Sequence, residues 1–151
     1  MLIKKVCLEI KEEFESIGPE YISNAFEAQD FVYNTIGKKT VECFEVIFMD
    51  FDYTPIEFSI IGIGDGSKTN IDIAEIFKIA LLSNAKHILV AHNHLGSSVV
   101  PTESDIKTTK EIGYIGKMLK IELIDSVVIN SSNNYYSIRK HELEKAKNAL
   151  E

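Results

Sequence analysis

The stretch Lys86-His87-Ile88-Leu89-Val90-Ala91-His92-Asn93-His94 decides how this chain folds and where its polar side chains gather. Its first part, Lys86–Ala91, is a largely apolar run typical of a short buried strand. Residues two apart on an extended chain point to the same side, so His92 and His94 project together where this strand ends. They form one wall of a predicted pocket.

A loop and a helix start follow the two histidines. Gly96–Ser98 favours a flexible loop, and Pro101 lacks a backbone donor and has a fixed φ. Thr102 is a residue type that caps helix N-termini, so Asp105 falls in the first turn of a predicted helix over Glu103–Leu119. The sequence therefore predicts a carboxylate close behind the two imidazoles.

Two imidazoles and one carboxylate are a ligand set for zinc (Zn²⁺). A tetrahedral zinc with three protein ligands keeps its fourth position for water, as in catalytic sites. Hydrolysis at such a site also needs a base for the proton of the water. The candidate base is Glu42, where a predicted strand over Val41–Phe51 begins. The sequence pattern does not itself bring Glu42 beside the histidines.

The spacing of His92, His94, Thr102 and Asp105 resembles the JAMM motif of JAB/MPN-domain metallopeptidases. Further blocks resemble the RadC-like branch of these proteins, and the resemblance covers residues 28–138. These blocks are Glu42-Cys43-Phe44, Glu75-Ile76-Phe77, Ala85 before the buried strand, Ala91-His92-Asn93-His94 and Ile124-Asp125.

The resemblance implies a zinc-dependent hydrolase that cleaves a peptide or isopeptide amide in a peptide or protein substrate. It implies His92, His94 and Asp105 as zinc ligands, Glu42 as general acid and base, and Thr102 as the hydroxyl that stabilises the oxyanion. It also implies a single α/β domain with a mixed sheet flanked by helices. We expect this domain over residues 28–151, after an N-terminal helical extension over residues 1–27.

Several positions depart from the RadC-like pattern. Leu95-Gly96-Ser97 replaces Pro-Ser-Gly after the second histidine, Ile73-Ala74 stands in place of Pro-Arg, and Ser126 replaces a histidine. Thr102 keeps the hydroxyl of the usual serine but adds a methyl group that restricts χ1. These changes keep open a second class, a non-catalytic JAB/MPN scaffold.

Each candidate residue also has an explanation without a metal. His92 and His94 would then be polar loop histidines, Glu42 a solvated strand residue, and Asp105 an acid that favours the positive end of a helix dipole. We expect structural roles for His87 and His141, which have no matching partners in the sequence. Cys43 points away from Glu42 on the predicted strand and is expected to be a buried thiol.

Composition predicts a single soluble domain in a reducing cytoplasm. The chain has 151 residues, 45% hydrophobic content and two cysteines, which do not make a disulfide framework. No run approaches the length of a membrane span, and the N-terminus lacks a secretory apolar stretch. The oligomeric state stays open.

The charge balance bears on a third class, a DNA-repair-associated factor of the RadC-like type. The net charge of −7 argues against nucleic acid as a partner for this chain alone, because nucleic-acid binders usually present a basic face. Because the segment ahead of the domain is short, we also expect this chain to lack the helix-hairpin-helix module of longer RadC-type chains.

Periodicity and turn residues give the expected order of elements. Helices are expected over residues 6–16, 27–36, 71–84 and 103–119 and in a polar C-terminal segment, and strands over residues 41–51, 56–63, 86–91, 121–129 and 135–138.

Overall fold

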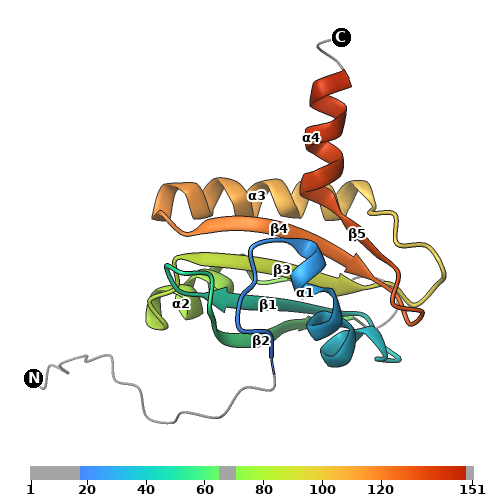
Figure 1. The fold of residues 1–151 in the computed structure, drawn as a ribbon, viewed down its shortest axis with the longest axis horizontal. Helices are drawn as coiled ribbons and strands as arrows, with labels where there is room; N and C mark the ends of the chain where they lie inside the picture. The colour runs from blue at the N-terminus through green and yellow to red at the C-terminus, as the bar shows by residue number, and fades with distance from the viewer. Residues whose placement is uncertain (1–17, 65–70, 149–151) are drawn as a thin grey trace, which may run out of the picture.

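A mixed five-stranded sheet with helices on both faces forms this protein (Figure 1). The computed structural model describes residues 18–64 and 71–148. The helices are α1 (Ala25–Val32), the π-helix η1 (Tyr33–Gly37), α2 (Ile73–Leu82), α3 (Glu103–Leu119) and α4 (Ile138–Asn148). The strands are β1 (Cys43–Met49), β2 (Pro55–Ile63), β3 (His87–Asn93), β4 (Glu122–Ile129) and β5 (Tyr135–Ser137). The predicted α/β architecture is confirmed.

The strand order β2-β1-β3-β4-β5 places β3 at the centre of the sheet. β3 pairs with β1 antiparallel and with β4 parallel. A parallel pair needs a crossover connection, and α3 supplies it between β3 and β4. The carboxyl end of β3 therefore lies where the crossover towards α3 begins, which brings the histidines and the start of α3 together.

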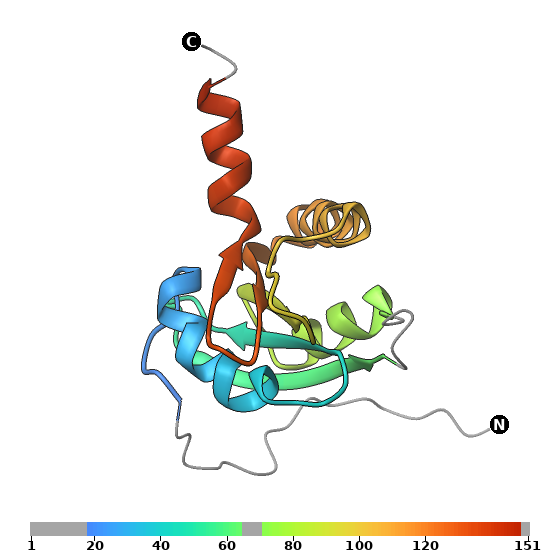
Figure 2. The same cartoon turned by 90° about the vertical axis from the view of Figure 1, so that its right-hand side faces the viewer.

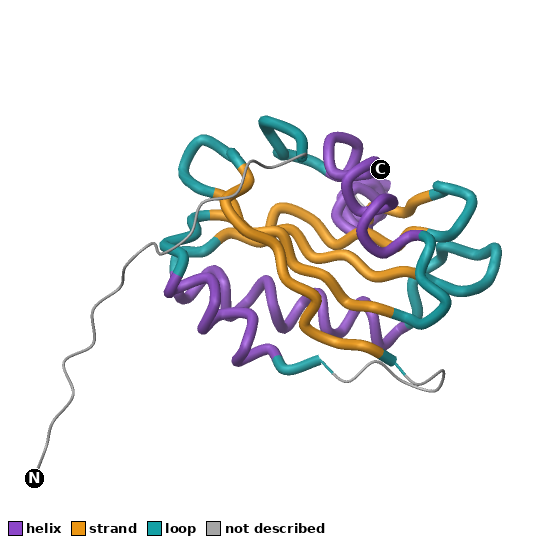
Figure 3. The backbone as a smooth tube through the Cα atoms, turned by 90° about the horizontal axis from the view of Figure 1, so that it is seen from below, coloured by secondary structure: helices purple, strands orange, loops and turns teal. Residues whose placement is uncertain are grey.

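Two apolar cores fill the two faces of the sheet, and Figure 3 shows helices on both sides of the strands. β1 is buried along its whole length because alternate side chains serve alternate cores. Cys43, Ile47 and Met49 pack on the face covered by α1 and η1, whereas Phe44, Val46 and Phe48 pack on the face covered by α2 and α3.

The first described helix differs from the prediction at both ends. It starts at Ala25 because the side chain of Asn24 accepts a hydrogen bond from the N–H of Glu27 and caps it. After Val32 it widens into the π-helix η1, where the Thr35 hydroxyl lies 3.1 Å from the carbonyl oxygens of Phe31 and Val32. π turns of this kind are rare and often mark functional positions.

Other boundaries moved by a few residues. β1 ends at Met49 because the Asp50 side chain accepts hydrogen bonds from the N–H groups of Asp52 and Thr54 in a turn. β3 continues to Asn93, two residues beyond the predicted strand, whereas α3 has the predicted bounds. The helix predicted over residues 6–16 lies outside the described residues.

The C-terminal helix α4 projects away from the sheet, as two perpendicular views show (Figures 1 and 2). His141 in α4 stacks on Tyr136 with ring centroids 4.0 Å apart, and His87 stacks on Tyr53 at the same separation. These contacts agree with the structural roles expected for both histidines. Among the described helices, none combines the length and apolar character that crossing a bilayer requires.

Candidate metal centre

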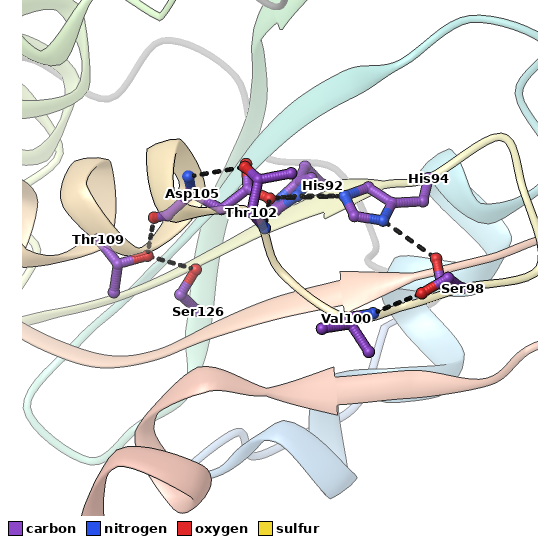
Figure 4. Close-up of polar contacts among 8 residues, drawn as sticks. All are labelled: His92, His94, Ser98, Val100, Thr102, Asp105, Thr109 and Ser126. Atoms are coloured by element: carbon purple, nitrogen blue, oxygen red, sulfur yellow. Dashed lines mark hydrogen bonds and ion pairs between the residues drawn. The ribbon is translucent and has the colours of Figure 1, made fainter.

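Three of the predicted site residues converge at the carboxyl end of β3 (Figure 4). His92 is the second-last residue of β3, His94 follows the strand, and Asp105 comes from the first turn of α3. The Nε2 atoms of the two histidines are 3.2 Å apart, and Asp105 Oδ2 lies 3.4 Å from His92 Nε2 and 3.5 Å from His94 Nε2. The three atoms form a nearly equilateral triangle.

This triangle fits a tetrahedral metal ion. Ligand atoms at about 2.0–2.1 Å from a tetrahedral zinc lie about 3.3–3.4 Å from one another. The observed separations bracket that value, and nitrogen and carboxylate oxygen are donors that zinc accepts. The side chains of His92, His94 and Asp105 are 12%, 18% and 22% exposed, so solvent reaches the triangle.

The ring of His94 is oriented for ligation. Its Nδ1 lies 3.0 Å from the carbonyl oxygen of Ser98. A carbonyl only accepts hydrogen bonds, so Nδ1 carries the proton in the neutral ring and Nε2 presents a lone pair to the triangle. The ring of His92 is backed by Phe44, which stacks at a centroid separation of 6.3 Å.

The carboxylate of Asp105 is held by the cap of α3. Asp105 Oδ2 accepts a hydrogen bond from the N–H of Thr102 at 2.8 Å, and Thr102 Oγ1 accepts one from the N–H of Asp105 at 3.2 Å. This reciprocal pair is a capping box. The predicted N-cap is therefore confirmed, and the same contacts aim Asp105 at the histidines.

The electrostatics of the triangle favour positive charge. Burial raises the pKa of the Asp105 carboxyl, but hydrogen bonds from His92 and His94 outweigh it and hold this pKa well below its usual range. The hydrogen bond with Asp105 raises the pKa of His94 against the opposite effect of burial, and the Ser98 carbonyl and the charges of Asp105 and Glu42 add to the increase. A divalent cation would supply the positive charge that this arrangement favours.

Glu42 is not part of the triangle, but the strand register brings it to the same end of the sheet. β1 and β3 pair with Phe44 opposite His92, so Glu42 and His94, each two residues further along, both lie just beyond the last pair of this ladder. The charge of Glu42 acts on His94, as its contribution to that pKa shows. This non-local relation was absent from the sequence pattern.

Sequence reasoning missed three residues that shape the site. Asn93 lies between the two histidines and is 1% exposed, Ser98 orients His94 through its backbone carbonyl, and Phe44 stacks behind His92. The backbone role of Ser98 leaves no signature in residue types. Asn93 lies two residues beyond the predicted strand over residues 86–91, so its burial and its partners were not expected.

Two of the departures from the RadC-like pattern, the loop after His94 and Ser126, lie next to elements of this centre. Leu95, in the loop after His94, is 51% exposed. Its side chain is therefore not buried over the three ligand atoms. The Ser126 hydroxyl is hydrogen-bonded at 3.0 Å to the hydroxyl of Thr109, which lies one helical turn after Asp105.

Cys43 is buried, and burial raises the pKa of its thiol, which agrees with an inert cysteine.

The family model of the RadC-like JAB domain matches residues 22–143. The chain belongs to this family. A UPF0758 protein of Staphylococcus carnosus is 32% identical over 111 residues, which cover 74% of this chain and 49% of that protein. UPF0758 protein FN0909 of Fusobacterium nucleatum is 34% identical over 116 residues, covering 77% of this chain and 50% of the relative.

A third relative, UPF0758 protein PM1152 of Pasteurella multocida, is 30% identical over 142 residues, covering 92% of this chain and 63% of the relative. The chain thus spans about half the length of the first two curated relatives and somewhat more of the third. The names of these relatives state no activity. Membership of the RadC-like JAB family therefore assigns no reaction by itself.

Proposed function

We propose that this protein is a zinc-dependent hydrolase of the JAMM type that cleaves a peptide or isopeptide amide. The observation that carries the proposal is the triangle of His92 Nε2, His94 Nε2 and Asp105 Oδ2, with sides of 3.2 to 3.5 Å. When bound, zinc would polarise the scissile carbonyl and lower the pKa of water from about 15.7 to about 7.

The residues around the triangle have complementary tasks in amide hydrolysis. Glu42 accepts the proton of the attacking water and later donates it to the leaving amine, which needs a proton before it departs. Thr102 Oγ1 uses a lone pair to accept from Asp105 N–H, and its own proton is left to donate to the tetrahedral oxyanion.

The accessibility of the site supports a polypeptide substrate. The three ligand side chains lie at one end of the sheet and keep 12% to 22% exposure. The loop from Leu95 to Val100 beside them is exposed except at Val99, so an extended chain approaches without displacing a buried element. We infer a peptide or protein substrate for this reason.

A direct test combines metal analysis with turnover. The full chain is purified, its zinc content measured, and its activity assayed on a library of peptides and isopeptide-linked conjugates with and without a chelator. We expect one zinc per chain and hydrolysis that the chelator abolishes. With zinc in excess, so that the metal stays bound, Glu42→Gln should lose at least about a hundredfold in activity. Glu111→Gln, at an exposed position of α3, is the matched control and should keep full activity.

Two outcomes contradict the proposal in different ways. Failure to take up zinc at stoichiometric concentration removes the metal centre. Stable zinc binding without chelator-sensitive hydrolysis of any substrate in the library would instead support the non-catalytic scaffold. Full activity of Glu42→Gln on a cleaved substrate would overturn the assignment of the base.

A further inference from the structure

Asn93 lies between the two histidine ligands, but its side chain bonds to β1 instead of facing the metal centre. Asn93 Oδ1 accepts a hydrogen bond from the N–H of Cys43 at 2.6 Å, and Asn93 Nδ2 donates to the carbonyl oxygen of Val41 at 3.0 Å. Both partners are backbone groups of the residues on either side of Glu42. One side-chain amide therefore clamps the backbone segment that carries the proposed base.

The clamp replaces backbone pairing that ends at this point. The β1–β3 ladder runs to the pair Phe44–His92, after which His94 turns towards β4 and donates its N–H to the carbonyl oxygen of Ile129 at 2.8 Å. The backbone pairing between β1 and β3 thus stops at the point where Glu42 must be held near His94. The Asn93 amide supplies one acceptor and one donor across the gap, as a backbone peptide would.

Glu42 is also held from the other side. The N–H of Gly64, the residue that follows β2, donates to the carbonyl oxygen of Glu42 at 2.7 Å. The peptide groups around Glu42 are thus fixed by β2 on one edge and by Asn93 on the other. Of these two attachments, only the one from Asn93 connects Glu42 to the strand that carries the histidines.

We propose that Asn93 is a positioning residue that holds Glu42 in register with the metal-binding histidines. This inference rests on the proposed role of Glu42 as general base. A purely apolar core position would be filled by an aliphatic side chain, because a buried amide stabilises only when its hydrogen bonds are made. Asn93 makes both, and both go to the segment at Glu42.

The first test uses metal-free protein and amide hydrogen exchange. In Asn93→Ala we expect exchange at Cys43 to accelerate because its acceptor is gone, and exchange at Gly64 to accelerate at least about tenfold because the Glu42 carbonyl moves. The control is Ser137→Ala, which removes a buried hydrogen bond between β5 and Asp125 of β4, at the edge of the sheet opposite β2. It should leave both amides protected. Acceleration at Cys43 alone would overturn the proposal, because Glu42 would then keep its place without Asn93.

The second test is a double-mutant cycle on zinc affinity, which needs no substrate. We expect Glu42→Gln to weaken zinc binding about tenfold in the natural background and no more than about twofold in the Asn93→Ala background. An equal weakening in both backgrounds would make Asn93 merely structural and reject the inference. A protein that binds no zinc refutes the metal centre, and the exchange experiment then still decides whether Asn93 holds Glu42.

Discussion

Glu45 is a fully buried acid on β1, on the face opposite the metal centre. Its Oε2 lies 2.7 Å from Thr35 Oγ1, and its Oε1 has no hydrogen-bond partner among the residues that the structure describes. The Thr35 hydroxyl carries one proton and also lies within hydrogen-bond distance of the carbonyl oxygens of Phe31 and Val32. If Thr35 donates to a carbonyl, Glu45 must donate to Thr35 and is therefore protonated.

The protonation of Glu45 predicts how stability depends on pH. Burial raises its pKa from 4.5 to about 7, against the lowering effect of the Thr35 hydrogen bond. The unfolded chain releases this proton near pH 4.5, whereas the folded chain keeps it up to about pH 7, so stability falls as pH rises across this window. We expect the free energy of unfolding of Glu45→Gln, relative to that of the natural protein, to increase by about 3 kcal/mol between pH 4.5 and pH 8. Denaturant unfolding measures this difference.

Burying the glutamine amide has a cost that does not depend on pH. This cost cancels when the difference between the two proteins at pH 8 is compared with the difference at pH 4.5. Glu57→Gln on β2, where the side chain is exposed, is the matched control and should run parallel to the natural protein. Parallel curves for Glu45→Gln would show that Glu45 ionises equally in both states.

Thr102 caps α3 and holds the metal ligand Asp105, and it is also proposed to stabilise the oxyanion. Substitutions at Thr102 can test the first role separately from the second. Thr102→Ala removes the acceptor for Asp105 N–H, which should cost about 1 kcal/mol of stability and weaken zinc binding about tenfold through a looser Asp105. Thr102→Ser should restore both quantities, and Ser104→Ala in the same turn should change neither. Unchanged zinc affinity in Thr102→Ala would confine Thr102 to the oxyanion role.

At the level of elements, α3 ends with a close backbone approach that only glycine allows. A Cβ at Gly116 would overlap the carbonyl oxygen of Ile121, a backbone atom that cannot rotate away. We expect Gly116→Ala to destabilise the protein by about 1–3 kcal/mol despite the better helix propensity of alanine. Thermal or urea unfolding measures this loss.

Gly113, one turn earlier in α3, is the control for this substitution. A Cβ there would meet only a Leu123 methyl group at 3.7 Å, an ordinary contact. Gly113→Ala should therefore be neutral or should stabilise by up to about 1 kcal/mol. Equal effects of the two substitutions would show that the approach of Ile121 does not constrain the helix.

The elements whose limits depend on local chemistry were the ones that sequence reasoning predicted well. α3 has the predicted bounds because Thr102 caps it and Lys120 ends it in the left-handed conformation. The π-helix η1 was missed because it depends on whether the chain continues as an α-helix or widens into a π turn after Val32. Residue periodicity does not record that choice.

The candidate site divides in the same way. His92, His94 and Asp105 lie on one strand-loop-helix segment, so their spacing along the chain predicted that they converge, and the structure brings them together. The position of Glu42 depends on how β1 pairs with β3, and the clamp by Asn93 depends on where that pairing ends. Strand pairing between distant segments is not encoded in any local pattern, so these two features required the structure.

For the whole molecule, the proposed metal would connect β3 to α3 across the loop that separates them. An ion that binds only the folded arrangement stabilises it by mass action, by about 2.7 kcal/mol at a hundredfold excess over Kd. We expect zinc to raise the Tm by about 5–10 °C. A chelator should reverse this shift, and Asp105→Asn should reduce it. Mg²⁺, which prefers oxygen ligands, should leave the Tm unchanged. An equal zinc-induced shift in His92→Ala would mean that zinc stabilises the protein from another site.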